Sequence, residues 1–491
     1  MQLNDPSILR VNAYVDGNWV ASKKRFGVTN PANGKLVAEV ADLGATEVTG
    51  AIDAAVMAQR QWANRTAKDR AMIMRKWHDL IIANAEDLAV ILTTEMGKPL
   101  AEAKGEVAYG ASFIDWFAEE ARRICGDVLE TPQSDKRLLT FKQPVGVFGA
   151  ITPWNFPIAM VTRKVAPGIA AGCTCVLKPA EQTPLSALAL AELAERAGLP
   201  AGVMNIVTGI DAPAIGKTLC ADNRVRKMTF TGSTEVGRIL MRQSADSVKK
   251  MSLELGGNAP LLVFDDADLE KAVAGAMMSK FRNAGQTCVC ANRIFVQDGI
   301  YDSFSKRLAD ATKALQVGNG MTAGVEQGPI IDNQGLAKIQ RHVKDAVDKG
   351  ASLLTGGKPH KLGGTFFEPT VLTEMTSDMQ LFREETFGPV AALFKFSDED
   401  DAIAMANDSP FGLQGAATNL LWSRAIRYKD REDWTNFDAT LEQITKLQPH
   451  FIEVWDFQGH NVAFNISVEF DDYRDKYRQV IKGFNLLKQG I

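Results

Sequence analysis

The chain has 491 residues, too many for one ordinary hydrophobic core, so two or three domains are expected. A net charge of −4, with no basic run, argues against a nucleic-acid partner. Six cysteines form neither a disulfide framework nor a zinc pattern. No apolar run reaches the ~18 residues of a membrane span. The start of the chain, residues 1–6, has no charged region followed by an apolar core, so no signal peptide is expected. A soluble globular protein of a reducing compartment, the cytoplasm, is predicted.

The first 145 residues mix short strands with helices. Asp16 and Gly17 are typical of the tip of a β-hairpin. Apolar residues then recur every three or four positions, which predicts helices over residues 48–63, 68–94 and 100–124. Residues 137–142 alternate like an exposed strand.

From residue 146 buried strands alternate with helices. The predicted strands are 146–152, 173–178, 203–207 and 227–231, and the predicted helices between and after them are 184–197 and 234–243. This order is typical of a parallel, doubly wound sheet, which binds ligands beyond the carboxyl ends of its strands.

A second α/β pattern follows, with a strand over 260–264, a helix over 269–280 and further elements to about residue 418. Past residue 420 aromatic residues become frequent and glycine becomes rare. Helices over 441–462 and 473–489 are predicted there.

Cys288 follows the predicted helix and a short polar stretch, Asn283 to Thr287. A single cysteine is most often a small buried hydrophobic residue. The polar and small neighbours, and a second thiol at Cys290, favour a reactive cysteine instead.

Glu254 ends a strand-like run before the pair Gly256-Gly257, which permits close backbone approach. It could act as a general base toward a thiol-bound intermediate, or be a strand-end carboxylate in water. Asn155, in Pro153-Trp154-Asn155-Phe156-Pro157 after a buried strand, could donate to an oxyanion or belong to a rigid proline-bounded turn.

Two further strand ends carry residues suited to a dinucleotide. Phe230-Thr231-Gly232-Ser233 reads as a strand followed by a glycine turn and a helix, which suits a phosphate, although many α/β turns share this pattern. Lys178 and Glu181 follow another strand, where they could contact the adenosine ribose or form a surface ion pair.

Together these stretches resemble the aldehyde dehydrogenase superfamily, and within it the succinate-semialdehyde dehydrogenases. The resemblance covers about residues 5–415, and its motifs occur in family order. They are Pro153-Trp154-Asn155-Phe156-Pro157, Lys178-Pro179-Ala180-Glu181, Phe230-Thr231-Gly232-Ser233, Leu253-Glu254-Leu255-Gly256-Gly257, Gly285-Gln286-Thr287-Cys288 and Glu384-Glu385-Thr386-Phe387-Gly388-Pro389.

The resemblance implies an oxidoreductase in which Cys288 is the nucleophile, Asn155 binds the oxyanion and Glu254 activates the hydrolytic water. It also implies cofactor contacts from Trp154, Lys178, Glu181, Gly232, Ser233, Glu385 and Phe387. A carboxylate at Glu181 would repel a 2′-phosphate, so NAD is expected over NADP, and no metal is expected.

The resemblance further implies that Arg163 and Arg282 hold the carboxylate of succinic semialdehyde, an intermediate of GABA degradation, although either could form a structural salt bridge. Cys290 is a possible redox switch through a disulfide with Cys288.

The expected fold is α/β: a Rossmann-type dinucleotide-binding domain (1–134 and 153–254), bridging strands (135–152), a second α/β catalytic domain that is incomplete at its C-terminus (255–420) and an atypical helical segment (421–491). Family members would be homodimers or homotetramers, but the strand that joins the partner is missing from the tail. Two alternatives stay open: an enzyme forming acyl-CoA, which Glu254 argues against, and an inactive dehydrogenase body that serves as a scaffold.

Overall fold

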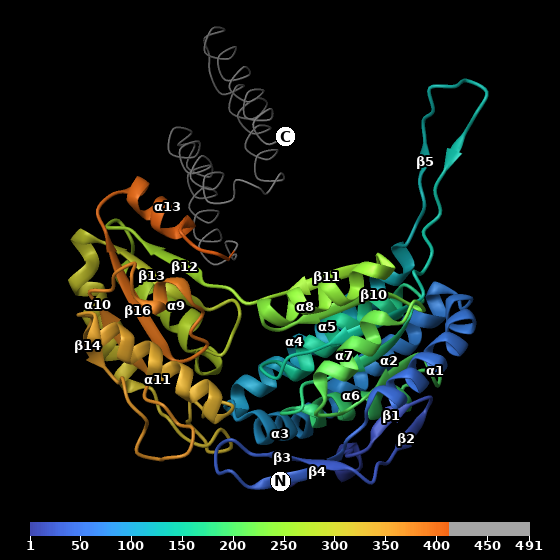
Figure 1. Cartoon of the computed structure of the whole chain (residues 1–491), viewed down its shortest axis with the longest axis horizontal. Helices are drawn as coiled ribbons and strands as arrows, with labels where there is room; N and C mark the ends of the chain where they lie inside the picture. The colour runs from blue at the N-terminus through green and yellow to red at the C-terminus, as the bar shows by residue number, and fades with distance from the viewer. Residues whose placement is uncertain (412–491) are drawn as a thin grey trace. The chain divides into compact units, whose positions relative to one another are not determined.

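The computed structural model describes residues 1–411 (Figure 1). These residues form two compact units. One unit comprises Met1–Gly256, Gln316–Leu336 and Pro359–Phe366, and the other begins with Gly257–Leu315 and continues with Ala337–Lys358 and the described residues from Phe367. The helices predicted over 441–462 and 473–489 lie outside the described residues. The predicted domain limits, including the bridging role of residues 135–152, stay predictions.

The first unit is built on a sheet of seven described strands in the order β11-β10-β7-β8-β9-β1-β2. The five strands from β11 to β9 are parallel, and β1 and β2 add an antiparallel edge. Their bounds are β1 (Ala13–Val15), β2 (Asn18–Val20), β7 (Val147–Ile151), β8 (Thr174–Lys178), β9 (Met204–Ile206), β10 (Val225–Thr231) and β11 (Lys250–Glu254). The parallel, doubly wound sheet predicted from the sequence is confirmed.

Helices cover both faces of this sheet (Figure 1). They are α1 (Ala45–Ala63), α2 (Ala67–Ala83), α3 (Ala85–Met96), α4 (Leu100–Glu120), α5 (Pro157–Ala170), α6 (Pro184–Arg196), α7 (Ala212–Ala221) and α8 (Thr234–Ser244). Successive residues of β7 point to opposite faces, so Phe148 packs with α5 and α6 while Val147 packs with α1 and α7. Burial on both faces explains why these strands are continuous apolar runs.

The single helix predicted over residues 68–94 is wrong, because α2 ends at Ala83 and α3 begins at Ala85. Asn84 between them leaves helical geometry, with φ −106° and ψ 20°, and its side chain donates to the Leu80 carbonyl at 2.8 Å. Asparagine competes in this way for backbone hydrogen bonds, and periodicity alone does not reveal the break.

Three hairpins accompany the sheet of the first unit. Asp16 and Gly17 form the tip between β1 and β2 with φ of 53° and 71°, as predicted. The others pair β3 (Arg25–Thr29) with β4 (Leu36–Ala41), and β5 (Val128–Leu129) with β6 (Leu138–Leu139). The exposed strand predicted over residues 137–142 is therefore shorter in the structure, since β6 pairs with β5 over only two residues.

The second unit has its own sheet in the order β12-β13-β16-β15-β14, parallel except for the edge strand β14. Its elements are β12 (Ala259–Val263), α9 (Leu269–Phe281), β13 (Ala291–Gln297), α10 (Asp298–Ala314), β14 (Ser352–Thr355), β15 (Thr370–Thr373), α12 (Gln380–Arg383), β16 (Val390–Phe396) and α13 (Glu399–Asn407). Helix α11 (Asn333–Asp348) begins in the first unit and lies mostly in the second.

Candidate active site

Four neighbouring strands of the first unit end in register at one edge of the sheet. Thr231 of β10 lies opposite Glu254 of β11, and Ile151 of β7 lies opposite Lys178 of β8. Because each predicted site segment of this unit follows one of these strands, the fold places all of them along one edge.

The loop after β7 carries Trp154 and Asn155 into the start of α5. Asn155 is only 5% exposed, and the Trp154 carbonyl accepts a hydrogen bond from the Thr183 hydroxyl at 3.5 Å. The backbone N–H of Thr152 donates to the Lys178 carbonyl at 3.1 Å. These contacts hold the segment between β7 and α5 against the segment that follows β8.

Lys178 and Glu181 form an ion pair beyond β8, with 3.0 Å between Nζ and Oε2. The Lys178 side chain is buried, and its ammonium also donates to the Pro179 carbonyl at 3.1 Å. Glu181 stays 39% exposed, so this carboxylate is held in place and still faces solvent.

The turn after β10 is shaped for an anionic group. Ser233 caps α8 by accepting a hydrogen bond from the Val236 N–H at 3.3 Å. The other N–H groups of the first turn are available to a phosphate. A Cβ on Gly232 would lie 2.4 Å from the Phe230 ring, so a larger residue would displace that ring. The turn leaves room for an anionic group at the start of α8, and its role as a phosphate site stays a prediction.

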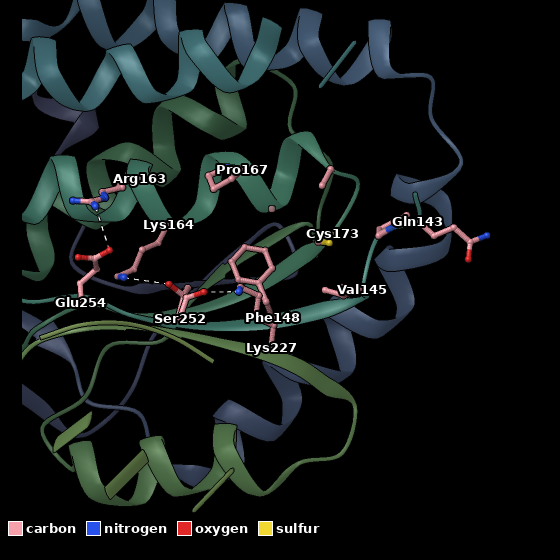
Figure 2. A pocket seen from close by; sticks show the side chains of 14 residues that line it. Gln143, Val145, Phe148, Arg163, Lys164, Pro167, Cys173, Lys227, Ser252 and Glu254 are labelled. Atoms are coloured by element: carbon pink, nitrogen blue, oxygen red, sulfur yellow. Dashed lines mark hydrogen bonds and ion pairs between the residues drawn. The ribbon is translucent and has the colours of Figure 1, made fainter. Parts of the chain in front are cut away.

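A pocket of about 430 Å³ lies between α5 and the strands β7, β10 and β11 (Figure 2). Arg163 of α5 and Glu254 at the end of β11 point toward one another inside it, with Nη2 and Oε1 3.3 Å apart. Their side chains are 41% and 55% exposed, so the pair contributes little to stability. Both charged groups remain accessible from solvent.

Lys164, which the sequence did not single out, lies deeper in the same pocket (Figure 2). Its ammonium donates to the Thr229 hydroxyl at 3.1 Å. Burial lowers the pKa of Lys164 to about 8, with a smaller contribution from Arg163 and Lys227, while Glu254 opposes the shift. The available signal was its place directly after Arg163, in a helix whose other residues are mostly apolar.

In the second unit Cys288 lies in a loop between α9 and β13 and is partly exposed. Three successive residues before it, Asn283, Ala284 and Gly285, have φ between 53° and 69°. Non-glycine residues rarely adopt such angles, and their presence near reactive groups is a recurrent feature of functional sites. Hydrogen bonds between Asn283 and Gln286 stabilise the turn.

Gly285 fits this loop against a second predicted segment. A Cβ at position 285 would lie 2.1 Å from the carbonyl oxygen of Gly388, which follows Phe387. The two loops precede β13 and β16, which are neighbouring parallel strands. In this unit the predicted residues therefore gather at the amino ends of strands, unlike those of the first unit.

Cys290 is buried, two residues beyond Cys288. Its Sγ lies 3.6 Å from the ammonium of Lys280 and 3.5 Å from the Gly285 carbonyl oxygen. The Lys280 ammonium also donates to the Asn292 side chain at 2.9 Å. All six cysteines of the chain are reduced thiols in the structure.

Glu385 and Phe387 lie in the segment before β16. Glu385 Oε1 accepts a hydrogen bond from the Gly257 N–H at 3.3 Å, and burial raises the pKa of Glu385 to about 7 despite this bond and the nearby Lys338. The ring of His342, which the sequence did not single out, contacts Thr386 Oγ1 at 3.2 Å and Glu384 Oε2 at 3.1 Å. These contacts hold the side chains of the two residues that flank Glu385.

The structure therefore places the predicted site residues in two groups, one in each unit. Asn155, Arg163 and Glu254 lie in the first unit with Trp154, Lys178, Glu181, Gly232 and Ser233, while Cys288, Cys290, Arg282, Glu385 and Phe387 lie in the second. Arg282 is exposed at the turn after α9. Within residues 1–411 no helix is long and apolar enough to cross a membrane, and no three His, Cys, Asp or Glu side chains are grouped to hold a metal.

Known proteins resemble this chain over most of its length. The model of the "Aldehyde dehydrogenase family" matches residues 19–437. A 3-sulfolactaldehyde dehydrogenase of Pseudomonas putida is 58% identical over 415 residues, covering 84% of this chain and 85% of the relative. The succinate-semialdehyde dehydrogenase [NADP(+)] GabD of Escherichia coli (strain K12) is 57% identical over 415 residues, covering 84% and 86%.

The crystal structure of succinate-semialdehyde dehydrogenase from Burkholderia pseudomallei superimposes with a TM-score of 0.83 at 56% identity, covering 84% of this chain and 86% of that one. The family match, this likeness and the order of the motifs agree with one another. The chain therefore belongs to the aldehyde dehydrogenase family and is an NAD(P)-dependent enzyme similar to succinate-semialdehyde dehydrogenases.

Proposed function

We propose that this enzyme oxidises succinic semialdehyde, or a similar short aldehyde bearing a carboxylate, to the acid. The observation that carries the proposal is the exposed Arg163 guanidinium beside Glu254 in the pocket of Figure 2. A planar guanidinium suits a carboxylate. The names of the two curated relatives, which act on sulfolactaldehyde and succinic semialdehyde, support an aldehyde that carries an anionic group.

In this proposal the Cys288 thiolate adds to the aldehyde carbon and makes it tetrahedral, with the Asn155 amide donating to the oxyanion. The bound cofactor supplies the hydride acceptor. The acyl group then remains on Cys288 as a thioester, and Glu254 takes a proton from the water that hydrolyses it. Glu254 thereby favours water over CoA as the acyl acceptor.

Arg163 and Arg282 are both exposed residues, and the distal carboxylate of the substrate could bind to their side chains. We assign substrate selection to this pair. The alternative for Arg163, a structural salt bridge with Glu254, is weakened by the exposure of both side chains, because such a pair contributes little to folding.

NAD is proposed as the preferred cofactor. The Glu181 carboxylate is held by Lys178 and faces solvent, where it can accept hydrogen bonds from ribose hydroxyls. A 2′-phosphate at ~4 Å would be repelled by roughly 4 kcal/mol at an effective dielectric near 20, partly offset by Lys178. Trp154, Gly232, Ser233, Glu385 and Phe387 complete the proposed cofactor contacts.

Two further parts of the proposal concern assembly and redox state. The β5–β6 hairpin exposes apolar side chains, including 76% of Val128 and 54% of Leu139, which favours a homo-oligomer formed through it. Leu139→Asp should then lower the molecular mass measured by light scattering.

Cys290 is proposed to form a disulfide with Cys288 under oxidation, and peroxide inactivation that persists in Cys290→Ala would refute this role. A cytoplasmic location is proposed because the number and spacing of the six cysteines do not suggest a disulfide framework.

The deciding experiment measures NADH formation by the purified chain with succinic semialdehyde. Wild type should be active, Cys288→Ala should be inactive, and Glu254→Gln should release about one NADH per site in a burst before stalling at the thioester. A folded protein that binds NAD but forms no NADH would favour the scaffold hypothesis, which the dehydrogenase relatives do not support.

A further inference from the structure

The loop that carries Asn155 is anchored by a buried ion pair from the helical layer of the first unit. Lys98, just before α4, and Glu106, within α4, lie 2.5 Å apart between Nζ and Oε2, with side chains 0% and 1% exposed. The same ammonium donates to the backbone carbonyl of Asn155 at 2.8 Å. It also lies 3.8 Å from the centroid of the Phe156 ring. The Lys98 ammonium thus contacts Asn155 and Phe156, the two residues directly before Pro157.

The other carboxylate oxygen of Glu106 holds the start of α5. Oε1 accepts hydrogen bonds from the backbone N–H groups of Ile158 at 2.9 Å and Ala159 at 3.2 Å. Pro157, the first residue of α5, has no N–H to offer. Glu106 therefore replaces the missing cap of α5 from a neighbouring helix, and its two oxygens join the helix start to the Asn155 backbone through Lys98.

A buried ion pair is poor evidence for stability, because the loss of hydration of both charges offsets most of their attraction. The pair instead fixes one segment of the backbone. Apart from the contact between Lys98 and Glu106, all the contacts named above are made to residues 155–159. A misplacement of a reacting group by about 1 Å can cost on the order of a hundredfold in rate, so fixing this backbone would benefit catalysis.

We propose that Lys98 and Glu106 are positioning residues that fix the Asn155 amide where it can donate to the oxyanion. The inference rests on the proposed function, in which Asn155 has that role. Removing an oxyanion donor typically lowers kcat by about 100- to 1000-fold. Displacing it should therefore lower kcat by at least about tenfold, with little change in the KM for NAD.

The test uses two variants of the full chain, because Lys98→Met alone leaves Glu106 as an unpaired buried charge and can unfold the protein. The second variant, Lys98→Met with Glu106→Gln, removes both charges and keeps an oxygen that accepts from the start of α5. Melting temperature and NAD binding report folding. Glu192→Gln, which removes the partner of Arg10 and Arg196 elsewhere in the first unit, is the matched control.

Two readouts separate positioning from a structural defect. With succinic semialdehyde deuterated at the aldehyde carbon, the isotope effect on kcat should rise in the double variant, because a misplaced Asn155 slows the steps through hydride transfer. A smaller fraction of active enzyme would leave that ratio unchanged. When Asn155 is already alanine, the double substitution should lower kcat by less than about a further twofold, because the effects of substitutions at interacting residues are not additive.

An unchanged isotope effect would overturn the inference and leave the proposed function standing. The same result would follow if the double substitution lowered kcat by the same factor in Asn155→Ala as in the wild type. Full activity of Asn155→Ala itself would remove the proposed oxyanion role, and the positioning role with it. A double variant that keeps wild-type kcat would also overturn the inference alone.

Discussion

Arg163 and Glu254 form an ion pair in the pocket, with 3.3 Å between Nη2 and Oε1. In the proposed mechanism one of them binds the substrate carboxylate and the other activates water. An incoming carboxylate would compete with Glu254 for the guanidinium, so substrate binding would release the base. Binding of the acidic substrate and readiness for hydrolysis are thereby connected through a single contact.

The arginines should discriminate between charged and uncharged aldehydes. Arg163→Ala and Arg282→Ala should each raise the KM for succinic semialdehyde by about 10- to 100-fold, the usual effect of losing a hydrogen bond to a charged group. The KM for butanal should change by less than threefold. Arg75→Ala, which removes an exposed ion pair between α2 and α4, is the control. Equal effects on the two aldehydes would refute the assignment.

Cofactor preference should depend on Glu181. Glu181→Ser removes the charge that opposes a 2′-phosphate and leaves Lys178 beside the ribose. The ratio of kcat/KM for NADP to that for NAD should rise by at least about tenfold, a part of the ~4 kcal/mol of repulsion. A wild-type enzyme that uses NADP as well as NAD would contradict the preference at the outset.

Cofactor binding should depend on pH through Glu385, whose buried carboxyl has a pKa raised to about 7. Above that pH the carboxylate can accept hydrogen bonds from ribose hydroxyls, so the KM for NAD should fall between about pH 6 and pH 8. Glu385→Gln should flatten this profile, while Glu270→Gln on α9 should not. A profile that Glu385→Gln leaves intact would assign the titration to another group.

Stability should depend on pH through Glu95, which is buried at the end of α3 and accepts the Leu185 and Ser186 N–H groups, each at 2.8 Å. Burial raises the pKa of Glu95 from 4.5 to about 8. The folded state therefore favours the protonated form, so this stabilisation is fully present below about pH 4.5 and is lost as the pH rises through about 8.

Glu95→Gln cannot ionise, so its melting temperature should improve relative to wild type as the pH rises from about 5 to 8. The difference in stability should change on the order of 1 kcal/mol per pH unit. Melting curves of the two proteins that shift in parallel with pH would contradict this.

The strands that carry the site were predictable because β7, β8 and β10 are buried on both faces and appear as apolar runs bounded by turns. Asn155, Lys178 and Ser233 could be proposed from their places at or just beyond the ends of such runs. Glu254 could be singled out only because a glycine pair follows it. Its strand, β11, is not a buried apolar run: Met251 and Leu253 are partly buried, and its other residues are exposed.

Lys98 and Glu106 could not be predicted, because they act on residues about 50 positions further along the chain. Their neighbours in sequence show only an amphipathic helix. The break at Asn84 was hidden because α2 and α3 continue the same periodicity on both sides of it. Local patterns determine elements, whereas contacts between α4 and α5 depend on the assembled layer.

Gly285 offers a simple way to distinguish working copies of this gene from decayed ones. Its positive φ and the 2.1 Å approach to the Gly388 carbonyl leave no room for any other side chain. In a library of all substitutions selected for growth on the aldehyde, only glycine should survive at this position. A genomic copy with any other residue there would then encode a protein in which the loop of the thiol and the segment that contains Gly388 no longer fit together.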